Sequence, residues 1–98
     1  VIGNSRCLLI TYSDGKYRNP YADAVIQTTA VQLLLESRGI ASCWSGYLAS
    51  FIAKNQSIKD LLGLPEGAAV HTALMTGYPA VETYLHLPKR KNLDLKTL

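Results

Sequence analysis

Apolar and polar residues alternate along the chain in short blocks whose spacing predicts the secondary structure. The apolar run 7–12 is rich in strand formers, which predicts a buried strand that ends at the turn 13–15. The runs 40–44 and 68–77 have the same character and predict two further strands.

Helices are expected between these strands. The longest is predicted over 22–38, with Gly39 just past its end in the position where glycine commonly stops a helix. A second helix is expected over 47–55. A third is expected to begin at Ser57, where the pattern Ser-x-x-Asp resembles a capping box, and to continue through Leu62. Strands and helices in this order predict an α+β fold with one mixed sheet and helices against it.

The helix 22–38 has apolar residues around most of its circumference. Polar residues gather on one side: Thr28, Thr29, Gln32 and Glu36. Apolar residues occupy two other sides: Ile26, Ala30, Leu33 and Leu34 on one, and Ala24, Val31 and Leu35 on the next. A surface helix would show a single apolar stripe, so this pattern predicts burial on most faces, as in a helix packed between subunits.

Composition points to burial beyond a single small domain. The hydrophobic fraction of 48% excludes a disordered chain. A domain of 98 residues buries only about two-thirds of its unfolded surface. Apolar segments this dense are therefore expected to pack against another chain or another part of the same one. The chain also opens on Val1 without a methionine, and we expect it to be a fragment or a processed piece.

Positive charge is concentrated near the end of the chain. The net charge of +3 comes mainly from Lys89, Arg90, Lys91 and Lys96, within a predicted extended arm over 80–98. Arginine and lysine together suit a phosphate group, although a solvated tail would show the same pattern. Without aromatic interleaving or a second basic patch, the cluster does not predict nucleic-acid binding.

The cysteines and the lengths of the apolar runs indicate the cellular compartment in which the protein is expected. Cys7 and Cys43 have neither metal-ligand nor redox-motif spacing, which favours a reducing, cytoplasmic setting. No apolar run reaches the roughly 20 residues that span a bilayer, so no membrane partner is expected.

The turn 42–46 is the first candidate site. A strand that ends in small residues and glycine before a helix can bring backbone close to a flat ligand, but it can equally be an ordinary connection. A thiol–imidazole pair of Cys43 with His71 or His86 is a weaker hypothesis, because a cysteine in an apolar run is more often a core residue. Zinc-ligand spacing, a Gly-rich phosphate loop and a carboxylate pair are all missing from the sequence, so no metal is expected and no catalytic side chain is assigned.

Several segments together resemble the FMN-dependent nitroreductase family. The stretch 23–40 is similar to the family's central helix, and 39–46 is similar to the turn Gly-(Leu/Ile)-x-Ser-x-Trp-x-Gly that follows it. The segment 58–67 resembles the next signature, and the strand end at 77–79 and the basic 88–91 complete the order. The resemblance covers nearly the whole chain.

The resemblance implies a homodimer through helix 22–38, with FMN bound at the subunit interface. It implies that Ser45 and Gly46 lie beside the isoalloxazine, and that Cys43 and Trp44, which directly precede them, form the approach to this cofactor site. It also implies that the basic run Lys89, Arg90 and Lys91 reaches the FMN phosphate.

The family's Arg-Ser-x-Arg motif has no counterpart in this sequence. Residues 1–12 resemble the strand that follows the half of the domain carrying that motif, so 1–98 is expected to be the C-terminal part of one nitroreductase-like domain.

The activity implied is hydride transfer from NAD(P)H through FMN to a nitroaromatic, a quinone or a similar acceptor. Because the flavin supplies this chemistry, no acid, base or nucleophile needs to stand out among the side chains. The alternative is a non-catalytic, dimerising α+β module or fragment without bound flavin, which would show the same lack of a catalytic constellation.

Overall fold

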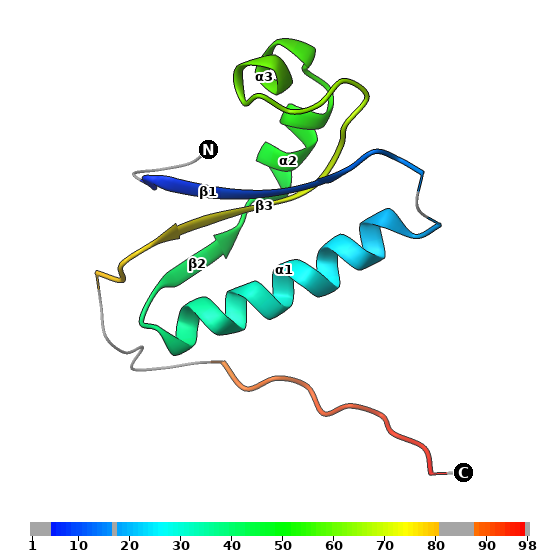
Figure 1. The fold of residues 1–98 in the computed structure, drawn as a ribbon. Helices are drawn as coiled ribbons and strands as arrows, with labels where there is room; N and C mark the ends of the chain where they lie inside the picture. The colour runs from blue at the N-terminus through cyan, green and yellow to red at the C-terminus, as the bar shows by residue number, and fades with distance from the viewer. Residues whose placement is uncertain (1–4, 17, 81–87, 98) are drawn as a thin grey trace.

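The computed structural model describes residues 5–16, 18–80 and 88–97 (Figure 1). The elements in chain order are β1 (Cys7–Ser13), α1 (Pro20–Ser37), β2 (Ala41–Trp44), α2 (Gly46–Ala53), α3 (Gln56–Leu61) and β3 (Ala69–Gly77). The predicted order of strands and helices and the α+β layout are confirmed.

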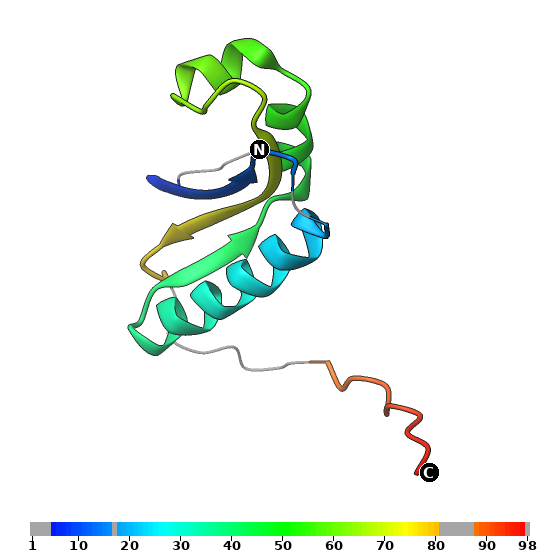
Figure 2. The ribbon, with the colours of Figure 1, turned by 45° about the vertical axis from the view of Figure 1, so that its right-hand side comes forward.

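The three strands form one sheet in the order β1-β3-β2, with both pairings antiparallel. Cys7 lies opposite Thr76 in the first pair, and Trp44 lies opposite Leu74 in the second. The last of the described strands, β3, is therefore the central one, as the views in Figures 1 and 2 both show. This order could not be read from the sequence, because the strands that pair are separated by whole helices.

The core is small and is centred on β3. Among the described residues, Ile52 of α2 and Leu74 of β3 are the largest side chains that are fully buried. Ala49 and Ala73 are buried as well. The side chains at the centre of the sheet are thus buried, whereas many large apolar side chains elsewhere in the chain are exposed.

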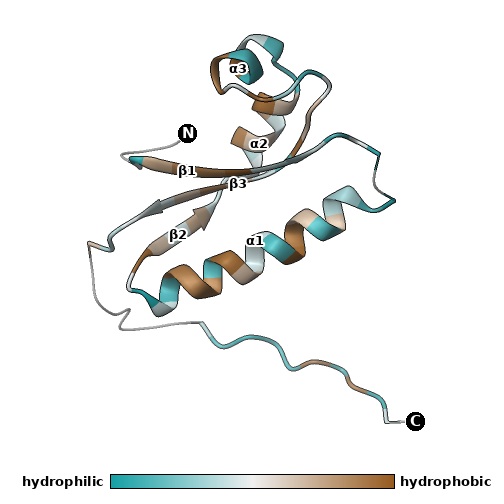
Figure 3. Ribbon diagram, viewed as in Figure 1, coloured by the Kyte–Doolittle hydropathy of each residue, from teal (hydrophilic) through white to brown (hydrophobic). Residues whose placement is uncertain are grey.

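The long helix is not buried on most faces within the single chain, so its predicted burial between subunits stays a prediction. Only Ala24 and Thr28 of α1 are buried, while Ile26, Leu33 and Leu34 are 68%, 63% and 55% exposed. The apolar segments of α1 appear brown in Figure 3. One sheet can cover only one side of a helix, so the remaining apolar sides of α1 stay uncovered in this chain.

Helix boundaries differ slightly from the prediction, for local reasons. α1 begins at Pro20, since proline suits the first turn of a helix, where its missing N–H would have no partner. The expected cap of α3 at Ser57 is wrong: Asn55 precedes the helix, and its side-chain oxygen accepts a hydrogen bond from the Ile58 N–H at 3.3 Å. α2 ends at Ala53 and does not reach Asn55 as predicted, since the backbone of Asn55 is extended and cannot continue a helix.

Residues 88–97 are exposed and belong to no helix or strand. The predicted arm over 80–98 also includes 81–87, outside the described residues, so the arm as a whole stays a prediction. Over the part of the chain that the structure describes, no helix has both the length and the apolar character to span a lipid bilayer.

Candidate functional site

The turn from β2 into α2 brings together the first group of predicted site residues. Cys43 and Trp44 are the last residues of β2, Ser45 is the N-cap of α2, and Gly46 is the first residue of that helix. Serine is among the residues favoured at this position, because its side-chain oxygen can accept a hydrogen bond from the N–H of the second or third helical residue. The Ser45 side chain makes no capping hydrogen bond, however.

The turn is held from two directions. The Ser45 N–H donates to the Ala73 carbonyl of the central strand at 2.9 Å, and Ser45 itself is buried. The indole Nε1–H of Trp44 donates to the Gln32 side-chain oxygen on α1 at 2.8 Å. The turn is therefore fixed both to the middle of the sheet and to the long helix.

The outer side of the turn is open. Gly46 is exposed, and a Cβ atom built on it would have no heavy atom within 4 Å among the described residues. The first N–H groups of a helix have no acceptor within that helix and carry its positive partial charge. The start of α2 thus offers backbone donors next to open space, which suits a flat molecule with acceptor atoms on its rim.

The hypothesis of a Cys43–His71 pair is wrong. His71 Nε2 lies 2.8 Å from the Ser13 hydroxyl oxygen, so the imidazole is engaged with β1. Cys43 lies opposite Met75 on β3, and four residues of extended strand, about 13 Å, separate that position from His71. The other proposed partner, His86, lies outside the described residues.

The basic cluster is not brought to this turn within the chain. Lys89, Arg90 and Lys91 are all exposed. In Figures 1 and 2, the segment 88–97 runs on the side of α1 that faces away from the sheet and α2. A shared role for the turn and the cluster therefore remains a prediction.

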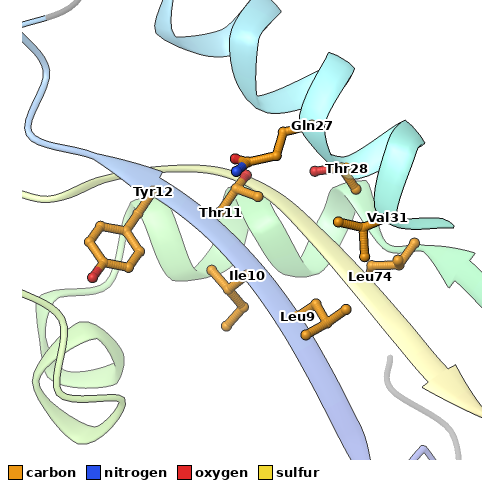
Figure 4. A pocket seen from close by; sticks show the side chains of 8 residues that line it. All are labelled: Leu9, Ile10, Thr11, Tyr12, Gln27, Thr28, Val31 and Leu74. Atoms are coloured by element: carbon orange, nitrogen blue, oxygen red, sulfur yellow. The ribbon is translucent and has the colours of Figure 1, made fainter. Parts of the chain in front are cut away.

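A cavity of about 340 Å³ between β1 and α1 has no counterpart in the sequence-based predictions. Its walls are residues 9–12 of β1, Gln27, Thr28 and Val31 of α1, and Leu74 of β3 (Figure 4). The lining consists of apolar groups, hydroxyls and one amide, so it can accommodate a largely uncharged group. The four-residue spacing of Gln27 and Val31, which places both on one helix face, is the signal that could have indicated it.

The role of Gln32 was also missed. The only hint in the sequence is an uncharged polar residue between the apolar residues 30–31 and 33–35. Such a residue is equally compatible with solvent, and only the packing of α1 beside β2 places it against Trp44.

Comparison with known proteins agrees with this fold. A family model described as "Nitroreductase family" matches residues 2–78. No curated protein gives a match.

Two solved structures are similar to the chain. One is a nitroreductase with bound FMN from Bacteroides fragilis NCTC 9343, with a TM-score of 0.84 and 23% identity over 99% of this chain and 53% of that one. The other is a nitroreductase with bound FMN from Desulfitobacterium hafniense DCB-2, with a TM-score of 0.70 and 23% identity over 90% of this chain and 49% of that one.

The chain therefore spans about half the length of these two proteins. At this level of identity the structural likeness shows a shared fold. The family match is independent of it and extends over most of the sequence, including β1, α1 and the turn at 43–46. The chain belongs to the nitroreductase family.

Proposed function

We propose that this chain is part of an FMN-dependent oxidoreductase in which the turn 43–46 lies against the isoalloxazine ring. The observation that carries the proposal is the family match over residues 2–78, which contains the whole turn. The two similar structures, both described as holding FMN, support it.

The residues of the turn fit this cofactor. An isoalloxazine is flat and has carbonyl and ring-nitrogen acceptors along one edge. Gly46 leaves the space in front of the turn open, and the N–H groups at the start of α2 are suitable donors. Lys89, Arg90 and Lys91 offer the charge that a phosphate requires, although their approach to the same site is part of the proposal.

In this proposal the protein binds FMN and orients its ring. When bound, FMN supplies hydride transfer, from NAD(P)H and on to an electron-poor acceptor such as a nitroaromatic or a quinone. The backbone of Ser45 and Gly46 sets the position of the ring edge. The bond from Ser45 N–H to the Ala73 carbonyl keeps that backbone in place when reactants enter and leave.

A homodimer through α1 is part of the same proposal. Ile26, Leu33 and Leu34 give α1 an exposed apolar side, which another subunit could cover. A cytoplasmic location fits as well, because Cys7 and Cys43 are both free thiols.

Release of flavin tests the proposal. The complete gene product, purified and then denatured, is expected to release FMN that is visible in the absorption spectrum. If it releases none and binds none when FMN is added, the protein is a module without flavin, and the oxidoreductase proposal is wrong.

A substitution of Gly46 tests the proposed location of the FMN site. Gly46→Leu should fold normally, because its Cβ meets open space, but the side chain would fill the region in front of the turn and reduce FMN binding. Gly77→Leu is the matched control, since Gly77 also has open space around a Cβ and lies away from the turn, at the end of β3. Equal FMN content in the two variants would contradict a site at Gly46.

A further inference from the structure

We propose that Gln32 is a positioning residue for the flavin turn, and that it acts only through its hydrogen bond to Trp44. The inference rests on the proposed function, because it assigns a role to a residue behind the proposed FMN site. Gln32 lies on α1, away from the turn in sequence, and its effect on FMN would be indirect.

The geometry of the bond carries the inference. The Gln32 side-chain oxygen lies 2.8 Å from Trp44 Nε1, a normal distance for a well-formed hydrogen bond. Trp44 is 38% exposed, so its N–H could bond to water if Gln32 were absent. The bond is therefore not needed to satisfy a buried donor. Its effect is to select one orientation of the indole.

The orientation of the indole matters because of where Trp44 lies. Among the described residues, β2 is an edge strand of only four residues and pairs on one side with β3. Trp44 is its last residue and is followed directly by Ser45 and Gly46. A short strand with one partner has few restraints of its own, so a side-chain bond at its final residue limits movement of the turn.

The position of Gln32 on α1 explains why this residue can reach the indole. Thr28, one turn earlier, is buried and bonds to Thr72 of β3. A residue four positions later projects from the same side of a helix, so Gln32 also faces the sheet. Leu33 and Leu34, in the same turn, are exposed. The Gln32–Trp44 bond thus connects the turn to the helix that is proposed to form the dimer.

The test uses substitutions that separate the bond from the fold. In the complete gene product, Gln32→Leu removes the acceptor and Gln32→Glu keeps it. Trp44→Phe removes the donor and keeps an aromatic ring. Gln27→Leu is the matched control, because it makes the same change on the same helix at a glutamine that lines the cavity beside β1, which contains no residue of the turn. The FMN dissociation constant is measured for each variant and for the double variant Gln32→Leu/Trp44→Phe.

The loss of one neutral hydrogen bond should weaken FMN binding about 3- to 10-fold in Gln32→Leu. Gln32→Glu and Gln27→Leu should stay within about twofold of the wild type. In the Trp44→Phe background, Gln32→Leu should have no further effect, because the bond is already gone. If Gln32→Leu weakens binding equally in both backgrounds, or in neither, the inference is wrong.

A second readout is independent of FMN. The indole N–H resonance of Trp44, identified by its loss in Trp44→Phe, should shift in Gln32→Leu and not in Gln27→Leu. An unchanged resonance in Gln32→Leu would show that the bond does not form in solution and would overturn the inference. Failure of the wild type to bind FMN would instead overturn the proposed function, and this inference with it.

Discussion

The hydroxyl oxygens of Thr28 and Thr72 lie 2.8 Å apart in the buried contact between α1 and the central strand. The Thr72 hydroxyl is also hydrogen-bonded to the hydroxyl of Thr11 on β1. Three elements that are distant in sequence are thus joined by one chain of hydroxyls. In the described part of the chain, every buried polar side-chain atom has a partner, so this polar contact is fully satisfied.

Removing the hydroxyl of Thr28 should destabilise the protein. Thr28→Val keeps the shape of the side chain but removes its bond to Thr72, so we expect the free energy of unfolding to fall by about 0.5–1.5 kcal/mol. Denaturant unfolding of the complete gene product measures this change. Thr29→Val is the control, since Thr29 is exposed and its hydroxyl donates to the Val25 carbonyl of its own helix. A loss as large in Thr29→Val would mean that the helix, and not the buried contact, is affected.

The cap of α3 distinguishes the sequence-based prediction from the structure. Asn55→Ala removes the oxygen that accepts from the Ile58 N–H and should cost about 1 kcal/mol of stability. Ser57→Ala should change stability by less than about 0.5 kcal/mol, because Ser57 is exposed and lies within the helix. Thermal or denaturant unfolding of the two variants gives the comparison. The reverse order of effects would restore Ser57 as the cap.

The exposed side of α1 should mediate dimer formation. Leu33→Lys places a charge where we propose that a second subunit packs, and a symmetric dimer carries the change twice. Burying one leucine contributes about 1.5–3 kcal/mol, so the dimer dissociation constant should rise at least about tenfold. Analytical ultracentrifugation measures it. Leu61→Lys, at an 82% exposed leucine on α3, is the control and should leave the dimer intact. A Leu33→Lys protein that dimerises like the wild type would rule out this surface.

The basic cluster should contribute to FMN affinity through the phosphate. Replacing Lys89, Arg90 and Lys91 together by alanine should weaken FMN binding about 10- to 100-fold, since a hydrogen bond to a charged group contributes about 1.5–3 kcal/mol. Fluorescence titration with FMN measures the affinity. The control removes the same charge at three exposed positions elsewhere: Lys16, Arg38 and Lys54. Equal weakening in both triple variants would indicate a general effect of net charge and refute the phosphate role.

Local structure was largely predictable from the sequence. The strand over 7–12 and the helix over 22–38 follow from runs and turn residues a few positions apart, and these short-range preferences act in the same way in the folded chain. The error at Asn55 is of the same local kind. Asparagine and serine are both favoured as N-cap residues. Asn55 is the cap in the structure because its backbone is extended, as an N-cap requires, whereas Ser57 already lies within the helix.

The arrangement of the site was less predictable. The sequence predicted that Cys43, Trp44, Ser45 and Gly46 form one turn, because they are consecutive. Two hydrogen bonds that hold this turn could not be deduced: Ser45 to Ala73, and Trp44 to Gln32. The first depends on the strand order, and the second depends on where α1 packs.

Three features follow from the order of residues alone: the succession of strands and helices, the position of the turn at 43–46 and the excess of apolar residues on the long helix. Which side of that helix faces the sheet depends on how the strands pack beside it. The side carrying Thr28 and Gln32 faces the sheet, while Leu33 and Leu34 remain exposed. The physical reason is that hydrogen-bonding partners for those polar side chains exist only once β3 and β2 lie beside α1. Periodicity describes one element at a time and carries no information about the partners that its neighbours will provide.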